Sequence, residues 1–318
     1  MLGLRSGKPV AVMIAAALLC APRIGAQDGA DWQAAAGGRM AFEVASVKPS
    51  KGGPISPGFP LNAGDAYRPT GGRFRADFPL WSYIQFAYKL WWPGDEQGRE
   101  IERLPKWVTA DRYAIEARAA GNPTKDQMRL MVQSLLAERF HLAAHFENRE
   151  VPVFALTLVK AGKPGPNLRS HADGPPCGDF DSSANNPVSP RVLSGDAGAV
   201  QTFPPFCDSP AVVKKANGTR LLLGYRNATM EMLASSLSGL VGLGRPVVDR
   251  TGLSGRFDFT LEWAPDSPGP PPSEPAAPEP MGPTALEALR DQLGLKVEGM
   301  KAPVRILVVD RVARPSEN

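Results

Sequence analysis

Residues 112–119 read RYAIEARA and residues 256–263 read RFDFTLEW, and these stretches are the matching centres of a pattern that occurs twice. Apolar and polar side chains alternate in both, as in a strand with one buried face. Around each stretch we expect a strand, a helix, a strand, a second helix and a closing pair of strands. The copies occupy residues 73–160 and 220–311. This order of helices and hairpin-forming strands predicts an α+β fold with mixed or antiparallel sheets.

The predicted helices of the two copies begin with similar signals. The first helices start at Leu80 and Met230, and apolar side chains then recur at helical spacing. The second helices follow Thr124 and Thr284, each with a Gln or Glu three residues later, which predicts two capping boxes. The similarity predicts an internal duplication. The alternative is a chance resemblance between two ordinary α+β patterns.

The first 26 residues have the features of a secretory signal peptide. Arg5 and Lys8 give a basic start, residues 10–19 are apolar, and Ile24-Gly-Ala26 places a small residue before Gln27. We therefore expect an exported protein, periplasmic or extracellular, whose mature chain begins at Gln27. No later segment reaches the ~20 apolar residues of a membrane span.

Lipidation at Cys20 is the alternative to cleavage before Gln27, but Leu19 stands where a small residue is normally required. Residues 1–26 carry three basic and no acidic side chains, so their removal lowers the formal charge from +4 to +1. A near-neutral chain without a dense Lys/Arg stripe gives no electrostatic basis for binding nucleic acid. We expect the partner to be a small ligand or another protein, which the sequence does not identify.

The predicted organisation after the signal peptide has three parts. Residues 27–160 form the first α+β unit, with an extra N-terminal strand in FEVASVKPS from Phe42. Residues 161–219 form a connector rich in Gly, Pro and Ser, which is long enough to indicate a functional or disordered loop. Residues 220–318 form the second unit, with a proline-rich surface insertion at 265–283.

The connector contains Cys177 and Cys207. In an exported protein an even pair in a long loop predicts a structural disulfide. The alternative is a redox couple or a metal pair. The sequence shows neither the close spacing nor the histidine partners that such chemistry needs.

Candidate catalytic residues are few. His141 and His145 have i, i+4 spacing but lie where a helix gives way to a strand, and on an extended chain that spacing is ~13 Å. His171 is a loop residue with no evident partner. Asp249 and Asp258 flank a turn and are expected to cap it or to pair with neighbouring arginines. We therefore expect no catalytic set, no metal and no cofactor.

Trp91 and Trp92 are the candidate ligand-binding residues. They follow the aromatic residues that are expected to face the core from the first helix. Tryptophans beyond such a helix are able to contact a sugar, a peptide or a partner protein.

Four separated motifs resemble a known family. They are FEVASVKPS, LLAERFHLAAHFENREVPVFALTLVKAG, RPVVDRTGLSGRFDFTLEW and LKVEGMKAPVRILVVDRVARPSEN. In this order they are similar to a secreted family expanded in soil acidobacteria, a domain of unknown function. The same domain is found attached to membrane metallopeptidases of the antibiotic-sensor type. The resemblance covers nearly the whole mature chain and implies export, but it supplies no catalytic or ligand residues.

Two functional classes follow from these observations. The duplicated scaffold and the lack of a catalytic set favour a non-enzymatic binding or interaction protein, of which a sensor-like protein is one form. Export and the unassigned carboxylates support the alternative, a secreted hydrolase of cell-wall or environmental polymers. A deep pocket with converging acids indicates the hydrolase, whereas a shallow aromatic or sheet-edge surface indicates binding.

Overall fold

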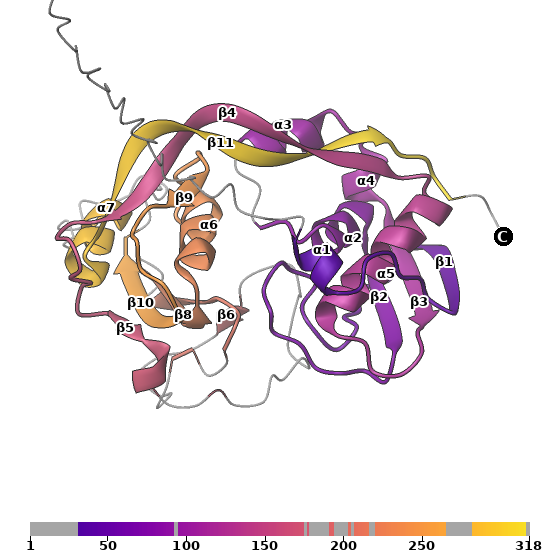
Figure 1. Cartoon of the computed structure of the whole chain (residues 1–318), viewed down its shortest axis with the longest axis horizontal. Coiled ribbons are helices and arrows are strands. Elements are labelled where there is room, and N and C mark those ends of the chain that lie inside the picture. The colour runs from indigo at the N-terminus through magenta and orange to yellow at the C-terminus, as the bar shows by residue number, and fades with distance from the viewer. Residues whose placement is uncertain are drawn as a thin grey trace, which may run out of the picture.

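The computed structural model describes residues 31–91, 95–174, 177, 191–193, 203–204, 207–215, 220–264 and 282–315. The predicted signal peptide, Gln27, Trp92 and most of the proline-rich insertion lie outside these residues. The described chain forms two lobes joined by a long two-stranded ribbon that arches over both (Figure 1). Within this part of the chain, no helix has the length and apolar character needed to cross a membrane.

The first lobe is a three-stranded antiparallel sheet covered by helices. Its strands pair in the order β1-β3-β2. The core lies between this sheet and the helices α2 and α5, and contains the aromatic residues that the sequence assigns to the first helix. The elements in chain order are α1 (Asp31–Ala35), β1 (Val44–Ser50), β2 (Arg73–Pro79), α2 (Leu80–Ala87), α3 (Asp95–Glu102), α4 (Trp107–Ala110), β3 (Arg112–Arg118) and α5 (Lys125–Arg139).

The second lobe is a five-stranded mixed sheet in the order β5-β10-β8-β7-β6. Its strands β5, β6 and β7 come from residues 161–219, so the expected connector supplies part of this sheet. The elements are β5 (Leu168–Ser170), η1 (His171–Asp173), β6 (Arg191–Leu193), β7 (Ala211–Lys215), β8 (Arg220–Ala228), α6 (Met230–Leu240), β9 (Val247–Asp249), β10 (Phe257–Trp263), α7 (Ala285–Ala288) and η4 (Leu289–Leu293). Mixed and antiparallel sheets with separate helices confirm the predicted α+β class.

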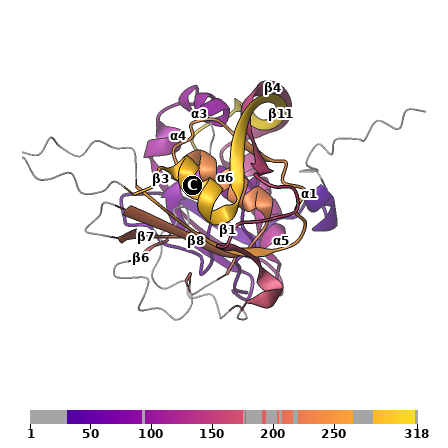
Figure 2. The same ribbon diagram turned by 90° about the vertical axis from the view of Figure 1, so that its left-hand side faces the viewer.

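The ribbon consists of β4 (Ala143–Leu158) and β11 (Leu295–Arg311), which pair antiparallel along their whole length. The predicted closing pairs of strands are therefore wrong, because each copy ends in one continuous strand. Pro152 and Pro303 suggested breaks between strands. β4 also pairs parallel with β9 over residues 154–156, so the ribbon belongs to a three-stranded sheet in the order β11-β4-β9. Both prolines lie outside that pairing, at an open edge where a proline costs no ladder hydrogen bond. Seen from the second lobe, the ribbon lies above α6, with β6, β7 and β8 below it (Figure 2).

The two ribbon strands exchange lobes. β4 leaves the core of the first lobe after Leu142 and brings Leu156 into the core of the second. β11 runs the other way, from Leu295 in the second lobe to Leu307 in the first. The side chain of Gln97 fixes this end, because it donates to the Leu307 carbonyl (3.0 Å) and accepts from the Leu307 amide (2.9 Å). Each lobe is thus completed by a strand from the other half of the chain.

Both predicted capping boxes are confirmed, at Thr124 and at Thr284. The strand order β1-β3-β2 of the first lobe also recurs as β5-β10-β8 in the second. Tyr113 pairs with a residue two positions before α2, and Phe257 with one two positions before α6. The internal duplication stays a prediction, and superposing the halves with Tyr113 on Phe257 tests it.

Candidate functional site

A cavity of about 500 Å³ opens on the sheet of the second lobe. We call it the sheet pocket, and its walls include Asn167, Phe203, Lys215, Arg220, Glu262 and Gln292. The β7–β8 register places Lys215 directly opposite Arg220, and like charges in that position destabilise a sheet. Glu262 on β10 offsets the repulsion, since its two oxygens each lie 3.3 Å from one of the cations. The strands therefore hold two cations around one acid.

Contacts within the second lobe hold two other wall residues of the sheet pocket in place. Gln292 binds the backbone of Glu262 through both of its amide atoms, at 2.9 Å to the N–H and 2.7 Å to the carbonyl. Phe203 lies directly over Gly224, where a Cβ would come within 2.4 Å of the ring. Lys215 and Arg220 provide the cationic groups of the sheet pocket.

A buried loop of the first lobe, residues 59–65, carries charge toward the second lobe. Lys125 and Arg129 from α5 fix it. The Lys125 Nζ donates to the Gly64 carbonyl at 2.6 Å, and the Arg129 guanidinium donates to the carbonyls of Asn62 (2.9 Å) and Gly64 (2.8 Å). Burial, together with the neighbouring arginine charge, lowers the pKa of Lys125 well below its usual range.

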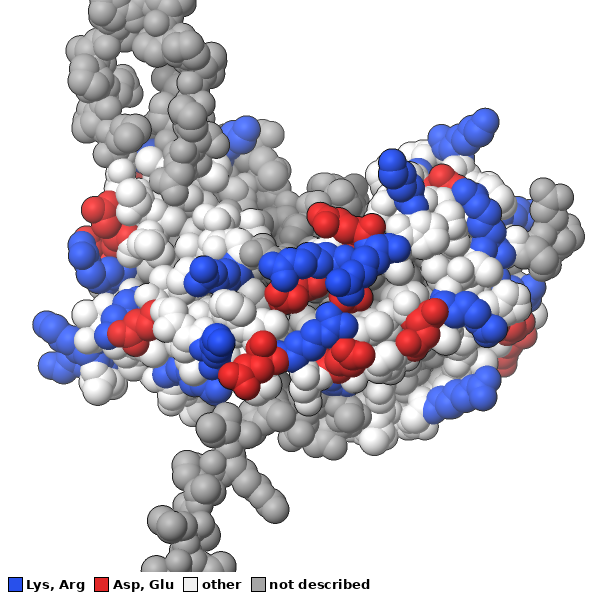
Figure 3. Space-filling model, turned by 90° about the horizontal axis from the view of Figure 1, so that it is seen from above, with Lys and Arg blue, Asp and Glu red and all other residues white. Residues whose placement is uncertain are grey.

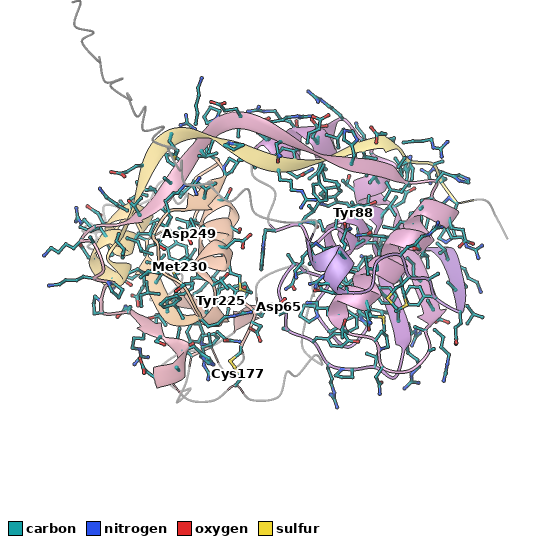
Figure 4. All side chains as sticks on the ribbon, viewed as in Figure 1. Asp65, Tyr88, Cys177, Tyr225, Met230 and Asp249 are labelled. Atoms are coloured by element: carbon teal, nitrogen blue, oxygen red, sulfur yellow. A yellow bond between two sulfur atoms is a disulfide. The ribbon has the colours of Figure 1, made fainter. Side chains whose placement is uncertain are left out.

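The loop ends at Asp65, on the side of the first lobe that faces the second (Figure 4). Asp65 pairs with Arg256 (3.0 Å) and with Lys89 (3.7 Å), and Arg256 also reaches Asp208 at 3.4 Å. Burial alone would raise the pKa of Asp65, but the Arg256 hydrogen bond and nearby cations outweigh it and lower that pKa. A Cβ on Gly64 would lie 2.9 Å from the Asp208 carbonyl, so the lobes touch closely here.

Unusual backbone geometry gathers at the same contact. Lys89, Asp208 and Asn227 have φ values of 55°, 59° and 59°, in the left-handed region that most residues avoid. Arg256 donates to the Asn227 backbone carbonyl at 2.8 Å, and the Asn227 side-chain amide donates to Asp208 at 2.7 Å. Such conformations persist only where surrounding contacts determine them. The hydrogen bonds among Asp208, Asn227 and Arg256 therefore hold the second-lobe side of this contact in one arrangement.

The predicted disulfide between Cys177 and Cys207 is confirmed. The accompanying expectation that the cysteines have no histidine partner is wrong. The Nε2 atom of His171 lies 3.4 Å from the Sγ of Cys177. Cys177 is exposed, whereas Cys207 is buried.

His171 also has a carboxylate partner, although the sequence shows none. Its Nδ1 atom lies 2.6 Å from Asp258, which accepts a second hydrogen bond from the Asn227 backbone N–H at 2.9 Å. Asp249 instead accepts from the backbone and hydroxyl of Thr251, both at 2.8 Å, as a predicted turn cap. Asp249 and Asp258 thus have separate roles and do not share a site.

Trp91 packs against the core of the second lobe and is half-buried. It follows α2 of the first lobe, so it belongs to the contact between the lobes. A ligand role for Trp91 and Trp92 stays a prediction, with Trp92 outside the described residues.

The exposed face of the ribbon carries both signs of charge side by side (Figure 3). There the two ring nitrogens of His145 face Asp310 (2.9 Å) and Glu147 (3.2 Å). His141 is exposed in the left-handed turn after α5, and its carbonyl accepts from Arg311. The two histidines therefore have different partners.

Hydrogen bonds from His145 first to Asp310 and then to Glu147 raise the pKa of this histidine. A raised pKa favours the folded state below the ordinary pKa, and this contribution is lost as the pH rises through the raised value. Titration by NMR should show the raised pKa, and Asp310→Asn should lower it. Asp291→Asn, an exposed carboxylate of the second lobe, is the control and should leave it unchanged. An unshifted His145 in the original chain would contradict this pairing.

Comparison with known proteins gives one family. A family model described as a protein of unknown function, DUF3738, matches residues 82–312. The chain belongs to the DUF3738 family. The match includes the sheet pocket, the disulfide and the whole ribbon, whereas the loop with Asp65 precedes it. No curated protein and no solved structure matches the chain significantly.

Proposed function

We propose that this chain is an exported binding protein that takes a small organic anion in the sheet pocket. The charge arrangement of the pocket carries the proposal. Lys215 and Arg220 share the single carboxylate of Glu262, so one positive charge is in excess. Ammonium and guanidinium groups together have more donors than one carboxylate occupies. A ligand carboxylate or phosphate fits these donors, and Phe203 offers an apolar contact beside them.

The same geometry disfavours the hydrolase alternative. Hydrolysis of glycosidic polymers normally uses two positioned carboxyl groups with different pKa values. Among the described residues that line the sheet pocket, Glu262 is the single acid, and both of its oxygens are paired with cations. A binding role needs no such pair.

Two observations support export and a sensing role. Disulfides persist in oxidising compartments outside the cytosol, and this chain contains one. The resemblance to domains attached to antibiotic-sensor-type metallopeptidases also suggests the ligands to try first. Muropeptides and β-lactams both carry carboxylates, so their charge suits the pocket.

A thermal-shift and calorimetry panel tests the proposal. It contains a muropeptide, benzylpenicillin and a neutral chito-oligosaccharide. A ligand of the folded state present at 100 times its Kd stabilises the protein by ~2.7 kcal/mol. We expect an anionic member to raise the Tm and the neutral sugar to leave it unchanged.

Arg220→Gln should weaken binding of that anion at least ~10-fold, because hydrogen bonds to charged groups contribute ~1.5–3 kcal/mol. Arg75→Gln is the matched control, since Arg75 also pairs with a glutamate but lies on the first lobe. Binding of the anion that is unchanged by Arg220→Gln, or binding of the neutral sugar alone, would show that the sheet pocket is not the anion site. Turnover of a polymer substrate would instead support the hydrolase alternative.

A further inference from the structure

The cluster of Cys177, Cys207, His171 and Asp258 has the asymmetry of a reactive thiol pair. Cys177 is exposed, while Cys207 has 6% of its surface accessible. In a dithiol that attacks an external disulfide, one sulfur must be accessible to that disulfide. The other must be buried nearby, where it is able to attack the mixed disulfide that forms. The two cysteines meet this requirement in the order Cys177 first and Cys207 second.

His171 is placed to control the proton of the accessible sulfur. Its Nε2 atom is 3.4 Å from the Cys177 Sγ, and the Sγ of Cys207 lies within 4.8 Å of a ring nitrogen of His171. Asp258 lies 2.6 Å from the opposite ring nitrogen and accepts from the Asn227 amide. An ionised Asp258 accepts only, so Nδ1 carries a proton and Nε2 faces the sulfur.

The position of Asp258 is itself fixed. Its residue is 7% exposed, and its second oxygen lies 3.9 Å from the guanidinium of Arg226. A Cβ on Gly174 would come within 2.6 Å of this carboxylate, so the turn after His171 closes directly over it. A carboxylate held this firmly fixes the orientation of the imidazole ring, so that Nε2 stays directed at the sulfur.

We propose that Cys177 and Cys207 form a thiol–disulfide exchange centre, in which Cys177 attacks, Cys207 resolves and His171 manages the proton. This inference goes beyond the proposed binding function and does not rest on it. The structure shows the oxidised product of the reaction, the Cys177–Cys207 disulfide.

The exchange balances in two steps. His171 takes the proton of the Cys177 thiol, and the Cys177 thiolate attacks an external disulfide RS–SR, forms a Cys177–SR bond and releases RS⁻, which takes that proton back from His171. Neutral His171 then takes the proton of Cys207, whose thiolate attacks the Cys177 Sγ, so that the second RS⁻ leaves and is protonated by His171. The protein dithiol is oxidised and the external disulfide is reduced to two thiols.

Several charges set the ionisation of Cys177. His171⁺ favours the thiolate, whereas Asp258 opposes it from behind the ring, with Arg226 beside that carboxylate. Asp208 follows Cys207 in the chain and interacts with the charge of His171. An adjacent histidinium lowers the pKa of a cysteine from ~8.5 to between ~3.5 and 7.5.

The first experiment follows the rate of alkylation by iodoacetamide against pH in Cys207→Ser, which leaves Cys177 as the single target of the pair. We expect a midpoint at least ~1 pH unit below the ~8.5 of free cysteine. Adding His171→Asn should return the midpoint to that value or above. A normal midpoint in Cys207→Ser, or one that His171→Asn leaves unchanged, would overturn the proposal.

A second measurement uses the chain without substitution, in case Cys207→Ser does not fold. The protein is reduced with dithiothreitol, exchanged into buffer at neutral pH and treated with substoichiometric iodoacetamide. Peptide mapping should find Cys177 labelled before Cys207. With oxidised glutathione, disulfide formation should be at least ~10-fold faster than in His171→Asn. Labelling of Cys207 first, or equal oxidation rates, would show that the disulfide is only structural.

Discussion

Arg129→Ala is expected to lower the free energy of unfolding by about 3–5 kcal/mol, the usual cost of removing one partner of a buried charged network. The side chain of Arg129 is 1% exposed. It pairs with Asp126, donates to two carbonyls of the buried loop and lies 5.5 Å from the centre of the Phe86 ring. Without it the two carbonyls lose a donor and a cavity remains under the loop. Urea denaturation measures the change.

The matched control for Arg129 is Arg75→Ala. Arg75 forms an ion pair with Glu116, but both side chains are about two-thirds exposed, and exposed pairs contribute ~0–1 kcal/mol. A loss below ~1 kcal/mol in Arg129→Ala would mean that the loop carrying Asp65 is held by its apolar residues alone.

Removal of the disulfide with Cys177→Ser and Cys207→Ser is the second large effect. The cysteines are 30 residues apart, and in the chain-entropy model closing such a loop contributes ~3–4 kcal/mol. The double variant should lose this amount in thermal or urea unfolding. The double variant also removes the contact between the Cys177 Sγ and the Nε2 atom of His171.

Reductant provides the control for this prediction. The unsubstituted chain should lose the same stability in a reducing buffer, whereas the double variant should be insensitive to it. Equal stability of oxidised and reduced forms would show that the unfolded chain gains little freedom when the bond opens. In the exchange proposed above, the protein dithiol is oxidised. Because the disulfide stabilises the folded state, folding in turn favours formation of the disulfide.

Elements determined by nearby residues were predictable from the sequence. The capping boxes depend on Thr124 and Thr284 with residues three positions away, and both are present. The strands of RYAIEARA and RFDFTLEW follow from alternation within a few residues. The ribbon was not predictable in this way, because it pairs Ala143–Leu158 with Leu295–Arg311. Local patterns do not say which distant strand is the partner.

The candidate sites depend even more on long-range contacts. His171 and Asp258 are 87 residues apart in the chain, so local sequence patterns do not predict that they form a pair. Lys215 and Glu262 meet because β8 lies between their strands in the sheet. Alternation predicts that β10 has a buried and an open face, but the strand order decides which charges share the open one.

The exchange of ribbon strands has a consequence for biosynthesis. Gln97 and Leu307 are 210 residues apart, and chains are synthesised at ~5–20 residues per second. At least ~10 s therefore pass between the appearance of Gln97 on the ribosome and that of the residue it binds. Throughout that time the first lobe lacks Leu307, which belongs to its buried core. We expect the first lobe to gain its complete core only after β11 has been synthesised, which is compatible with the export proposed above.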